Sequence, residues 1–469
     1  MTNTNTNSLR KFFNYFWIAV TGKETEFTTG SIRRAIFMLS IPMILEMLME
    51  SIFAIVDIAY VSQVSVNAVA TIGLTESVIT LVYALAIGIS MAATAVVARR
   101  IGEKNVAGAR VAAVQAITLG IIISILLGIV GILWAEEILQ LMGGEPDLIA
   151  EGSGYTRLLI GGNLTIMLLF LINAIFRGAG NASIAMWTLV LSNGLNIILD
   201  PIFIFGMGPV PEYGVMGAAI ATNIGRGSAV LFQLGILFFG WGKIKLAAKD
   251  LVLNLKVMYN LIKVSLGGIA QFLIGTSSWV FLMRIMSEFG SEVLAGYTIA
   301  IRVIMFTLMP AWGMSNAAAT LVGQNLGAQQ PDRAEVSVWK TGKYNAFFMG
   351  FVSLIYLIFA KTIISLFNDT LSVVESGALC LQVIAIGYVF YAYGMVVTQA
   401  FNGAGDTKTP TKINFFSFWM FQLPIAYFTA LVLDWGASGV FIAITAAEMV
   451  LAIMAIIWFK KGNWKRVQV

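Results

Sequence analysis

The chain has 469 residues, of which 58% are hydrophobic and 11% are charged, and its formal net charge is +5. Soluble proteins carry roughly 25% charged residues. This chain therefore cannot cover a water-facing surface of its size, and the composition predicts an integral membrane protein. Histidine is absent and Cys380 is the single cysteine, which excludes an internal disulfide, a thiolate metal cluster and histidine-based acid–base chemistry.

The first 31 residues precede the first apolar stretch. A polar start leads to Arg10, Lys11 and an aromatic patch from Phe12 to Ala19. This patch is too short to cross a bilayer and no small-residue cleavage site follows it, so we expect no cleaved signal peptide. We interpret residues 1–31 as an interfacial amphipathic arm.

Twelve apolar stretches follow, each long enough to cross a membrane. A spanning helix needs roughly 20 apolar residues, and several stretches are longer, which indicates tilt or extension beyond the bilayer. The prediction is an all-α integral membrane fold of twelve transmembrane helices. They are placed at 32–62, 67–98, 108–133, 153–176, 183–206, 214–240, 256–287, 292–324, 336–362, 375–401, 411–432 and 436–460.

The loops between these helices alternate in charge. One set, which includes both chain ends, is rich in Lys and Arg, and the other is poor in them. By the positive-inside rule the basic side is cytoplasmic. We therefore expect both termini in the cytoplasm, an even number of spans, and a location in the inner (plasma) membrane. The basic loops are interpreted as topology signals, so membrane lipids but no nucleic acid are expected as partners.

Two sequence motifs recur at one fixed offset. IFRGAGNAS at 175–183 resembles AFNGAGDTK at 400–408, and AVVARRIGEKNVAGAR at 95–110 resembles TLVGQNLGAQQPDRAE at 320–335. The same interval separates the two copies in both cases. The repeat predicts two pseudo-symmetric six-helix lobes in the same membrane orientation, with a ligand cavity between or within them and transport by alternating access. The expected divisions are an N-lobe at 32–240, a cytoplasmic linker at 241–256, a C-lobe at 257–460 and a basic cytoplasmic tail at 461–469.

The first predicted helix carries three acidic residues. Glu46, Glu50 and Asp57 fall on one stripe about 40° wide at 100° per residue, and Tyr60 extends this stripe. An ionisable residue within a span costs roughly 2.5–3.5 kcal/mol, so the stripe is expected to face the interior of the lobe.

The fifth predicted helix adds Asn193, Asn196 and Asp200 on one face, and Pro201 should kink its end and free a backbone carbonyl. Carboxylates and amides suit a proton relay or a hard cation such as Na⁺. A structural hydrogen-bonded network is the alternative. The predicted coupling-ion residues are Asp57, Asp200, Asn196, Asn193, Glu50 and Glu46, with Na⁺ considered at Asp57, Asn196 and Asp200.

The repeat serves as a control for these acids. At the same offset Glu46 corresponds to Gln271 and Asp57 to Leu282, and Asp200-Pro201 aligns with Leu423-Pro424. A purely architectural network should recur in both halves, so the asymmetry favours an ion site in the N-lobe alone. The substrate cavity is expected to include Tyr60, Gln271 and Gln399.

Other charges lie within the predicted spans. When YGVMGAAIA at 213–221 is aligned with WGASGVFIA at 435–443, Arg226 corresponds to Glu448. We expect these two either to pair across the lobe interface or to reach the membrane surface at helix ends. No GxxxxGKS/T, HExxH or GxSxG motif is present, so no enzymatic activity and no cofactor are expected.

The chain resembles the multidrug and toxic compound extrusion (MATE) family. The resemblance rests on IPMILEMLMESIFAIVDIAYVS at 41–62, on the RGAGN and NGAGD loops, and on NIILDP at 196–201. It implies a V-shaped central cavity and an antiporter that expels cationic or amphipathic small molecules against H⁺ or Na⁺. In the family's DinF-like branch, which this chain resembles most, the ion site is in the N-lobe, and Asp57, Asn196 and Asp200 match that pattern.

We expect a monomeric secondary antiporter. One rival interpretation is a lipid-linked sugar flippase of the same superfamily, against which twelve spans and an acidic lobe argue. The other is a passive channel, which only the demonstration of uphill transport would exclude.

Overall fold

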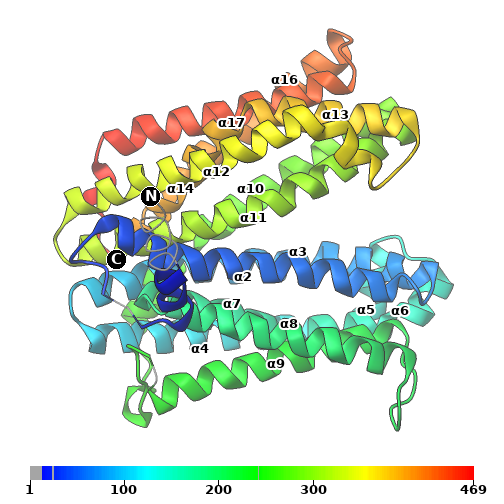
Figure 1. Ribbon diagram of the computed structural model, residues 1–469. Coiled ribbons are helices and arrows are strands. Elements are labelled where there is room, and N and C mark those ends of the chain that lie inside the picture. The colour runs from blue at the N-terminus through cyan, green and yellow to red at the C-terminus, as the bar shows by residue number, and fades with distance from the viewer. Residues whose placement is uncertain (1–12, 24–25, 241) are drawn as a thin grey trace, which may run out of the picture.

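The computed structural model describes residues 13–23, 26–240 and 242–469, and no β-strand occurs among them. Long helices form two bundles (Figure 1). The N-lobe contains α2 (Ile32–Val61), α3 (Val66–Gly102), α4 (Val106–Leu133), α5 (Ala135–Leu141), α6 (Pro146–Gly161), α7 (Leu164–Ala179), α8 (Ala182–Phe205) and α9 (Val215–Phe239). The C-lobe contains α10 (Leu255–Met286), α11 (Ser291–Gly327), α12 (Pro331–Ser365), α13 (Leu371–Ile386), α14 (Tyr388–Ala404), α15 (Lys408–Asn414), α16 (Leu423–Tyr427) and α17 (Ala437–Lys460).

Eleven helices of the described chain are long and apolar enough to cross a membrane, and the count reaches twelve if one bent pair is a single span. That pair is α13 and α14, which meet at Gly387 with a bend of 59° where one straight helix was predicted. The predicted eleventh helix is also irregular, because π-helical turns at Phe415–Gln422 and Phe428–Val432 flank α16. Pro424 lies between them and supplies no backbone N–H, which breaks the regular α-helical ladder there.

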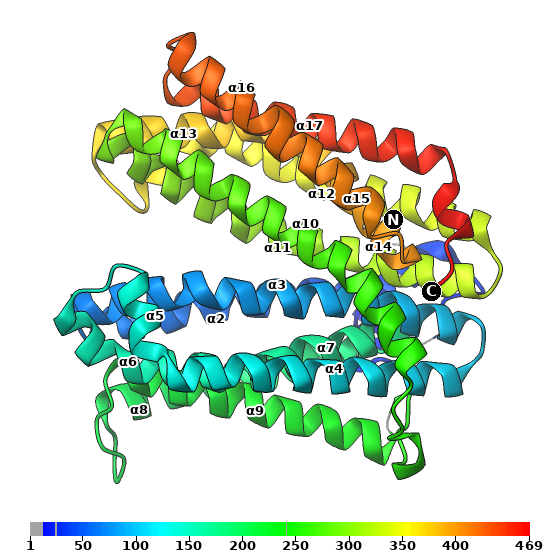
Figure 2. The ribbon, with the colours of Figure 1, turned by 180° about the vertical axis from the view of Figure 1, so that it is seen from behind.

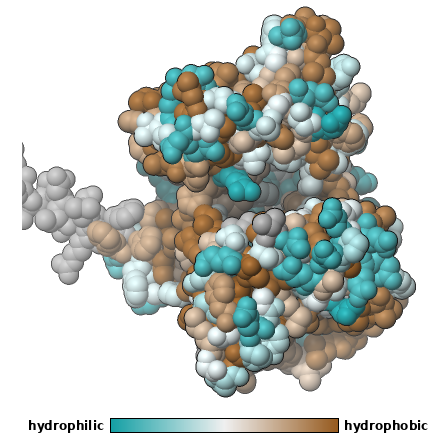
Figure 3. Space-filling view, turned by 90° about the vertical axis from the view of Figure 1, so that its right-hand side faces the viewer, coloured by the Kyte–Doolittle hydropathy of each residue, from teal (hydrophilic) through white to brown (hydrophobic). Residues whose placement is uncertain are grey.

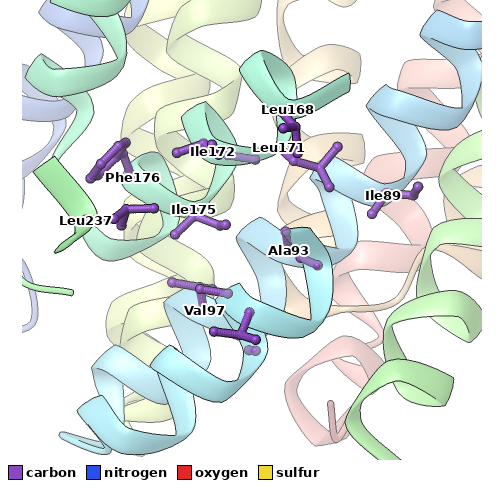
Figure 4. Close-up of a cluster of buried hydrophobic side chains, with 14 of the residues drawn as sticks. Ile89, Ala93, Val97, Leu168, Leu171, Ile172, Ile175, Phe176 and Leu237 are labelled. Atoms are coloured by element: carbon purple, nitrogen blue, oxygen red, sulfur yellow. The ribbon is translucent and has the colours of Figure 1, made fainter. Parts of the chain in front are cut away.

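Each lobe has its own apolar core. In the N-lobe, side chains of α3, α7 and α9 interlock, as Figure 4 shows for Ile89, Ala93, Val97, Leu168, Leu171, Ile172, Ile175, Phe176 and Leu237. In the C-lobe the core spans α10 to α17 and includes the thiol of Cys380 on α13, which is fully buried. Burial of apolar area between helices cannot alone drive association in lipid, so close packing must hold these cores together.

The lobes cross most closely where α3 and α11 end. A Cβ atom on Gly102 would overlap the carbonyl oxygen of Gln324, and one on Gly327 would overlap the carbonyl oxygen of Arg99. Gln324 occupies the repeat position of Arg99, just as Gly327 occupies that of Gly102. The contact is therefore reciprocal, and only residues without a side chain allow the two backbones to approach this far.

Both terminal segments bind across this crossing, and we call them the terminal clasp (residues 13–31 without the undescribed 24–25, and 461–469). Arg333 of α12 donates to the carbonyl of Gly30 at 2.9 Å, and Arg99 of α3 donates to that of Val467 at 2.7 Å. Lys465 binds Glu335 of α12 at 2.6 Å, and this hydrogen bond raises the pKa of Lys465. The clasp therefore fastens the end of the molecule at which the lobes touch (Figure 2).

Residues 1–12 of the predicted interfacial arm lie outside the described residues. Residues 13–21 form a short helix, and Trp187 of α8 donates its indole N–H to the carbonyl of Val20 at 3.0 Å. Phe13 and Trp17 are exposed on this helix, so contact with the membrane interface stays a prediction.

At the opposite end the lobes diverge and leave a cleft (Figure 3). Glu76 of α3 and Arg302 of α11 are exposed there, near enough to interact electrostatically. No salt bridge within the described residues joins them. The molecule is thus closed at the clasp end and open at the other.

We predict that Gly327→Val destabilises this conformation by about 1–3 kcal/mol, because the new side chain would overlap the Arg99 carbonyl. The measurement is the unfolding midpoint in mixed detergent and SDS micelles. Gly73→Val in α3 is the matched control, since nothing lies within 4 Å of that position. Equal midpoints for the two variants would show that the crossing does not depend on a glycine.

Candidate functional site

The acidic residues of α2 face other helices of the N-lobe. Glu46 is 1% exposed and Asp57 is partly buried, whereas the side chain of Glu50 is 30% exposed to solvent. The three residues follow one another along α2, separated by about one and two helical turns. Each therefore contacts different side chains of the lobe, with Glu46 nearest the clasp end (innermost) and Asp57 farthest from it (outermost).

The innermost acid, Glu46, pairs with Arg177 of α7 through a short hydrogen bond. Asn173, one turn earlier on α7, donates to the same oxygen of Glu46 at 3.3 Å and accepts from Gln233 of α9 at 2.5 Å. The second oxygen of Glu46 has no partner among the described residues. A buried ion pair with amide support therefore joins three helices.

The middle acid, Glu50, faces Arg226 of α9, with 3.9 Å between the charged atoms. Arg226 also donates to the hydroxyl of Tyr83 at 3.3 Å and lies 5.2 Å from the ring centre of Phe53. The guanidinium is thus enclosed by the N-lobe.

This position corrects the prediction for Arg226 and Glu448. Glu448 is buried in the C-lobe, near Tyr391 of α14. The two residues neither meet at the lobe interface nor reach the membrane surface, because each turns into the interior of its own lobe. Arg177 and Arg226 supply positive charges beside Glu46 and Glu50, so two acids of α2 have counter-charges within the N-lobe.

The outermost acid, Asp57, lies near Asp200 of α8, close enough for their charges to interact. Asn196 donates to Asp200 at 3.1 Å and to Thr222 of α9 at 3.3 Å. One oxygen each of Asp57, Asn196 and Asp200 is buried without a hydrogen-bond partner among the described residues. An unsatisfied buried acceptor is costly, so the three oxygens fit a group that supplies positive charge, either a proton or a small hard cation.

Asn193 has a different environment from its neighbours on α8. Its amide donates to the backbone carbonyl of Met49 on α2 at 2.9 Å. This bond ties α8 to α2 beside the acids. Pro201 lies within α8, which continues for one more turn to Phe205.

A cavity of about 220 Å³ lies between the lobes. Glu46, Glu50 and Arg177 line it from the N-lobe, and Gln399 and Asn402 line it from α14. Gln271 lies behind this wall and binds Asn402 at 3.0 Å. Tyr60 lies elsewhere, with its ring edge-on to Phe205 at 6.4 Å.

Several residues of this site were not found from the sequence: Asn173, Arg177, Tyr155 and Thr222. Tyr155 of α6 is buried within electrostatic range of Asp57. Arg177 had a usable signal, because the second copy of its motif has Asn402 at the same place. A charge in only one copy of a repeat indicates a local role.

We predict that Arg177→Asn alone destabilises the protein by about 3–5 kcal/mol, because it leaves the Glu46 carboxylate buried without a cation. The double variant Glu46→Gln/Arg177→Asn should recover most of that loss. Unfolding midpoints in SDS micelles compare the two. A single variant as stable as the double one would mean that Glu46 carries no charge in the folded protein.

Comparison with known proteins agrees with this architecture. The MatE family model matches residues 42–202 and 268–428, once in each lobe. The chain is 26% identical over 448 residues to a probable multidrug resistance protein NorM of Thermotoga maritima, which covers 93% of this chain and 94% of the relative. It is 21% identical over 432 residues to the multidrug export protein MepA of Staphylococcus aureus, with 92% and 94% covered.

Solved structures give the same result. An outward-facing multidrug resistance MATE transporter superposes with a TM-score of 0.88 at 26% identity, covering 94% of this chain and 99% of the other. A transporter of the MOP superfamily from Pyrococcus furiosus, described by the reversed polarity of its binding pocket, gives 0.86 at 26% identity with the same coverage. The resemblance to the multidrug and toxic compound extrusion family is confirmed, while the assignment to its DinF-like branch stays a prediction. The chain therefore belongs to the MatE family, the multidrug and toxic compound extrusion transporters, and is a multi-pass membrane protein of the efflux type.

Proposed function

We propose that this transporter exports small organic molecules, organic cations among them, in exchange for H⁺ or Na⁺, and that Asp57, Asn196 and Asp200 bind the coupling ion. The observation that carries this proposal is the set of three buried, unpartnered oxygens on these residues. The corresponding C-lobe positions of the two aspartates, Leu282 and Leu423, are apolar, so a single ion site in the N-lobe is expected.

Carboxylate and amide oxygens are ligands that suit Na⁺ or a shared proton equally. Binding of either would cancel one of the two negative charges of Asp57 and Asp200, which reduces their repulsion and lets α2 and α8 approach each other. Because α2 also carries Glu46 and Glu50 at the cavity, a change in its position would reach the substrate. Only a difference in ion affinity between two conformations can drive the transition.

The orientation follows from loop charge. With both termini in the cytoplasm, the clasp closes the inner end and the cleft opens outward. Export then requires the α3–α11 crossing and the terminal clasp to separate while the outer ends of the lobes approach each other. This is alternating access by rocking of two lobes around a central cavity.

Asp57→Asn and Asp200→Asn should each abolish ion-driven export, because the amide that replaces the carboxylate exchanges no proton and carries no negative charge to hold a cation. The measurement is efflux of a fluorescent organic cation from cells that express each variant, with surface expression quantified in parallel. Glu137→Gln, which removes an exposed carboxylate in α5, is the control and should leave efflux unchanged. Gln271→Ala should impair coupling less than either aspartate variant. Normal efflux with Asp57→Asn would contradict the N-lobe coupling site.

Purified protein in liposomes should accumulate an organic cation against its gradient when a pH or Na⁺ gradient is imposed, and should not do so without one. Separate pH and Na⁺ gradients identify the ion. If the organic cation only runs down its own concentration gradient, whichever ion gradient is imposed, the protein is instead a passive channel. Failure with organic cations combined with movement of a lipid-linked sugar across the bilayer would indicate a flippase.

A further inference from the structure

The buried ion pair at the cavity has a neutral counterpart in the C-lobe. Gln271 occupies the repeat position of Glu46, and Asn402 occupies that of Arg177. Gln271 donates to Asn402 at 3.0 Å, and Asn402 donates back to Gln271 at 3.2 Å. The fold therefore places a bonded pair of side chains at this position in both lobes, charged in one and uncharged in the other.

Charges are not needed to hold the helices together here. The amide pair joins α10 to α14 as the ion pair joins α2 to α7, and it avoids the desolvation of two ions. Replacing a buried ion pair with neutral partners is often neutral or stabilising. Packing at this position therefore does not require charges, and the place of the charged pair on the cavity wall points to a ligand.

Arg177 is the more exposed member of the pair. The side chain of Arg177 is 13% exposed to solvent, and that of Glu46 is 2% exposed. Of the five N–H donors of a guanidinium, the side-chain bonds recorded among the described residues use only Nη1, toward Glu46. Arg177 lines the cavity from the N-lobe, and Gln399 lines it from the C-lobe. This part of the cavity consequently offers hydrogen-bond donors and positive charge.

Glu50 lines the same cavity and carries the opposite charge from Arg177. It lies one helical turn from Glu46, about 6 Å along α2. Its side chain is 30% exposed, and Arg226 approaches it on the N-lobe side only to 3.9 Å, which is a longer contact than that between Arg177 and Glu46. A molecule that spans the two positions would meet a cation at Arg177 and an anion at Glu50. Bidentate guanidinium–carboxylate bonding is the strongest contact such a site can make.

We propose that Arg177 binds a carboxylate of the transported molecule while Glu50 binds its cationic centre, so that zwitterionic amphipathic molecules are preferred over plain cations. This rests on the proposed function, in which the cavity carries the substrate. Arg177 and Glu50 set specificity, and the ion site at Asp57 and Asp200 is separate from them.

The test uses two dyes that differ in one group. A rhodamine with a free carboxylate is a zwitterion, and its methyl ester is a cation of nearly the same shape. The ratio of their kcat/KM values, acid over ester, is measured in liposomes with the wild type and with Glu46→Gln/Arg177→Asn, which copies the C-lobe pair into the N-lobe. We expect the wild-type ratio to exceed one and the double variant to lower it about tenfold or more, as the loss of a charge-assisted contact implies.

The matched control removes an ion pair of the same kind away from the cavity. Glu136→Gln/Arg157→Asn neutralises an exposed pair of α5 and α6 and should leave the ratio unchanged. Fluorescence anisotropy gives the affinity of each purified variant for the two dyes without transport. The ratio of these affinities, acid over ester, decides the question if a variant binds dye but does not transport it.

The two dye ratios can contradict the proposal in the following ways. A wild-type ratio below one, or a ratio that the cavity double variant leaves unchanged, overturns the proposal. If the wild type moves neither dye under any ion gradient, the proposed function fails for these molecules, and the anisotropy ratio still tests the carboxylate contact by itself.

Discussion

The reciprocal crossing of α3 and α11 organises the rest of the molecule. Because Gly102 and Gly327 each accommodate a backbone carbonyl of the other helix, the lobes touch at one end and must diverge toward the other. The glycines of the RGAGN and NGAGD motifs pack against the same two helices within each lobe, since Gly178 of α7 meets the carbonyl of Thr94 on α3 and Gly403 of α14 meets that of Ala319 on α11. Arg177 and Asn402 directly precede these two glycines, so the packing of α7 on α3 and of α14 on α11 holds both residues in the lining of the cavity.

Lipid imposes the second rule, that an ionised side chain needs a partner or water. In the N-lobe two acids have an arginine partner, and one pair of acids has none among the described residues. Glu46 and Glu50 have guanidinium partners, whereas Asp57 and Asp200 have each other, an amide and unsatisfied oxygens. Asp57 and Asp200 have no arginine partner in the described part of the chain, so they suit an exchangeable cation as the coupling ion. Two adjacent carboxylate sites in one lobe can therefore serve different purposes, one for the ion and one for the transported molecule.

The sequence predicted the all-helical fold, and most helix bounds agree within a few residues, because apolar length alone determines them. The repeat and the acidic stripe of α2 could be read from spacing within one chain segment. Pairings between distant helices could not: Glu50 and Arg226 belong to the first and last long helices of the N-lobe, and nothing local indicates that they meet. The bend at Gly387 was missed for a related reason, since an apolar run reads as one straight helix whether or not its neighbours bend it. Tyr60 lay on the correct stripe but packs against Phe205, which helical geometry alone does not reveal.

The burial of Cys380 has a practical consequence. The only thiol of the chain lies in the core of the C-lobe with no exposed area, where water-soluble maleimides and spin labels do not reach it. Cysteines introduced at Glu76 and Arg302, on the exposed outer halves of α3 and α11, can therefore be labelled in an otherwise native background. Electron paramagnetic resonance or single-molecule fluorescence between these two labels would report the opening and closing of the cleft directly, as a distance that changes with each turn of the transport cycle.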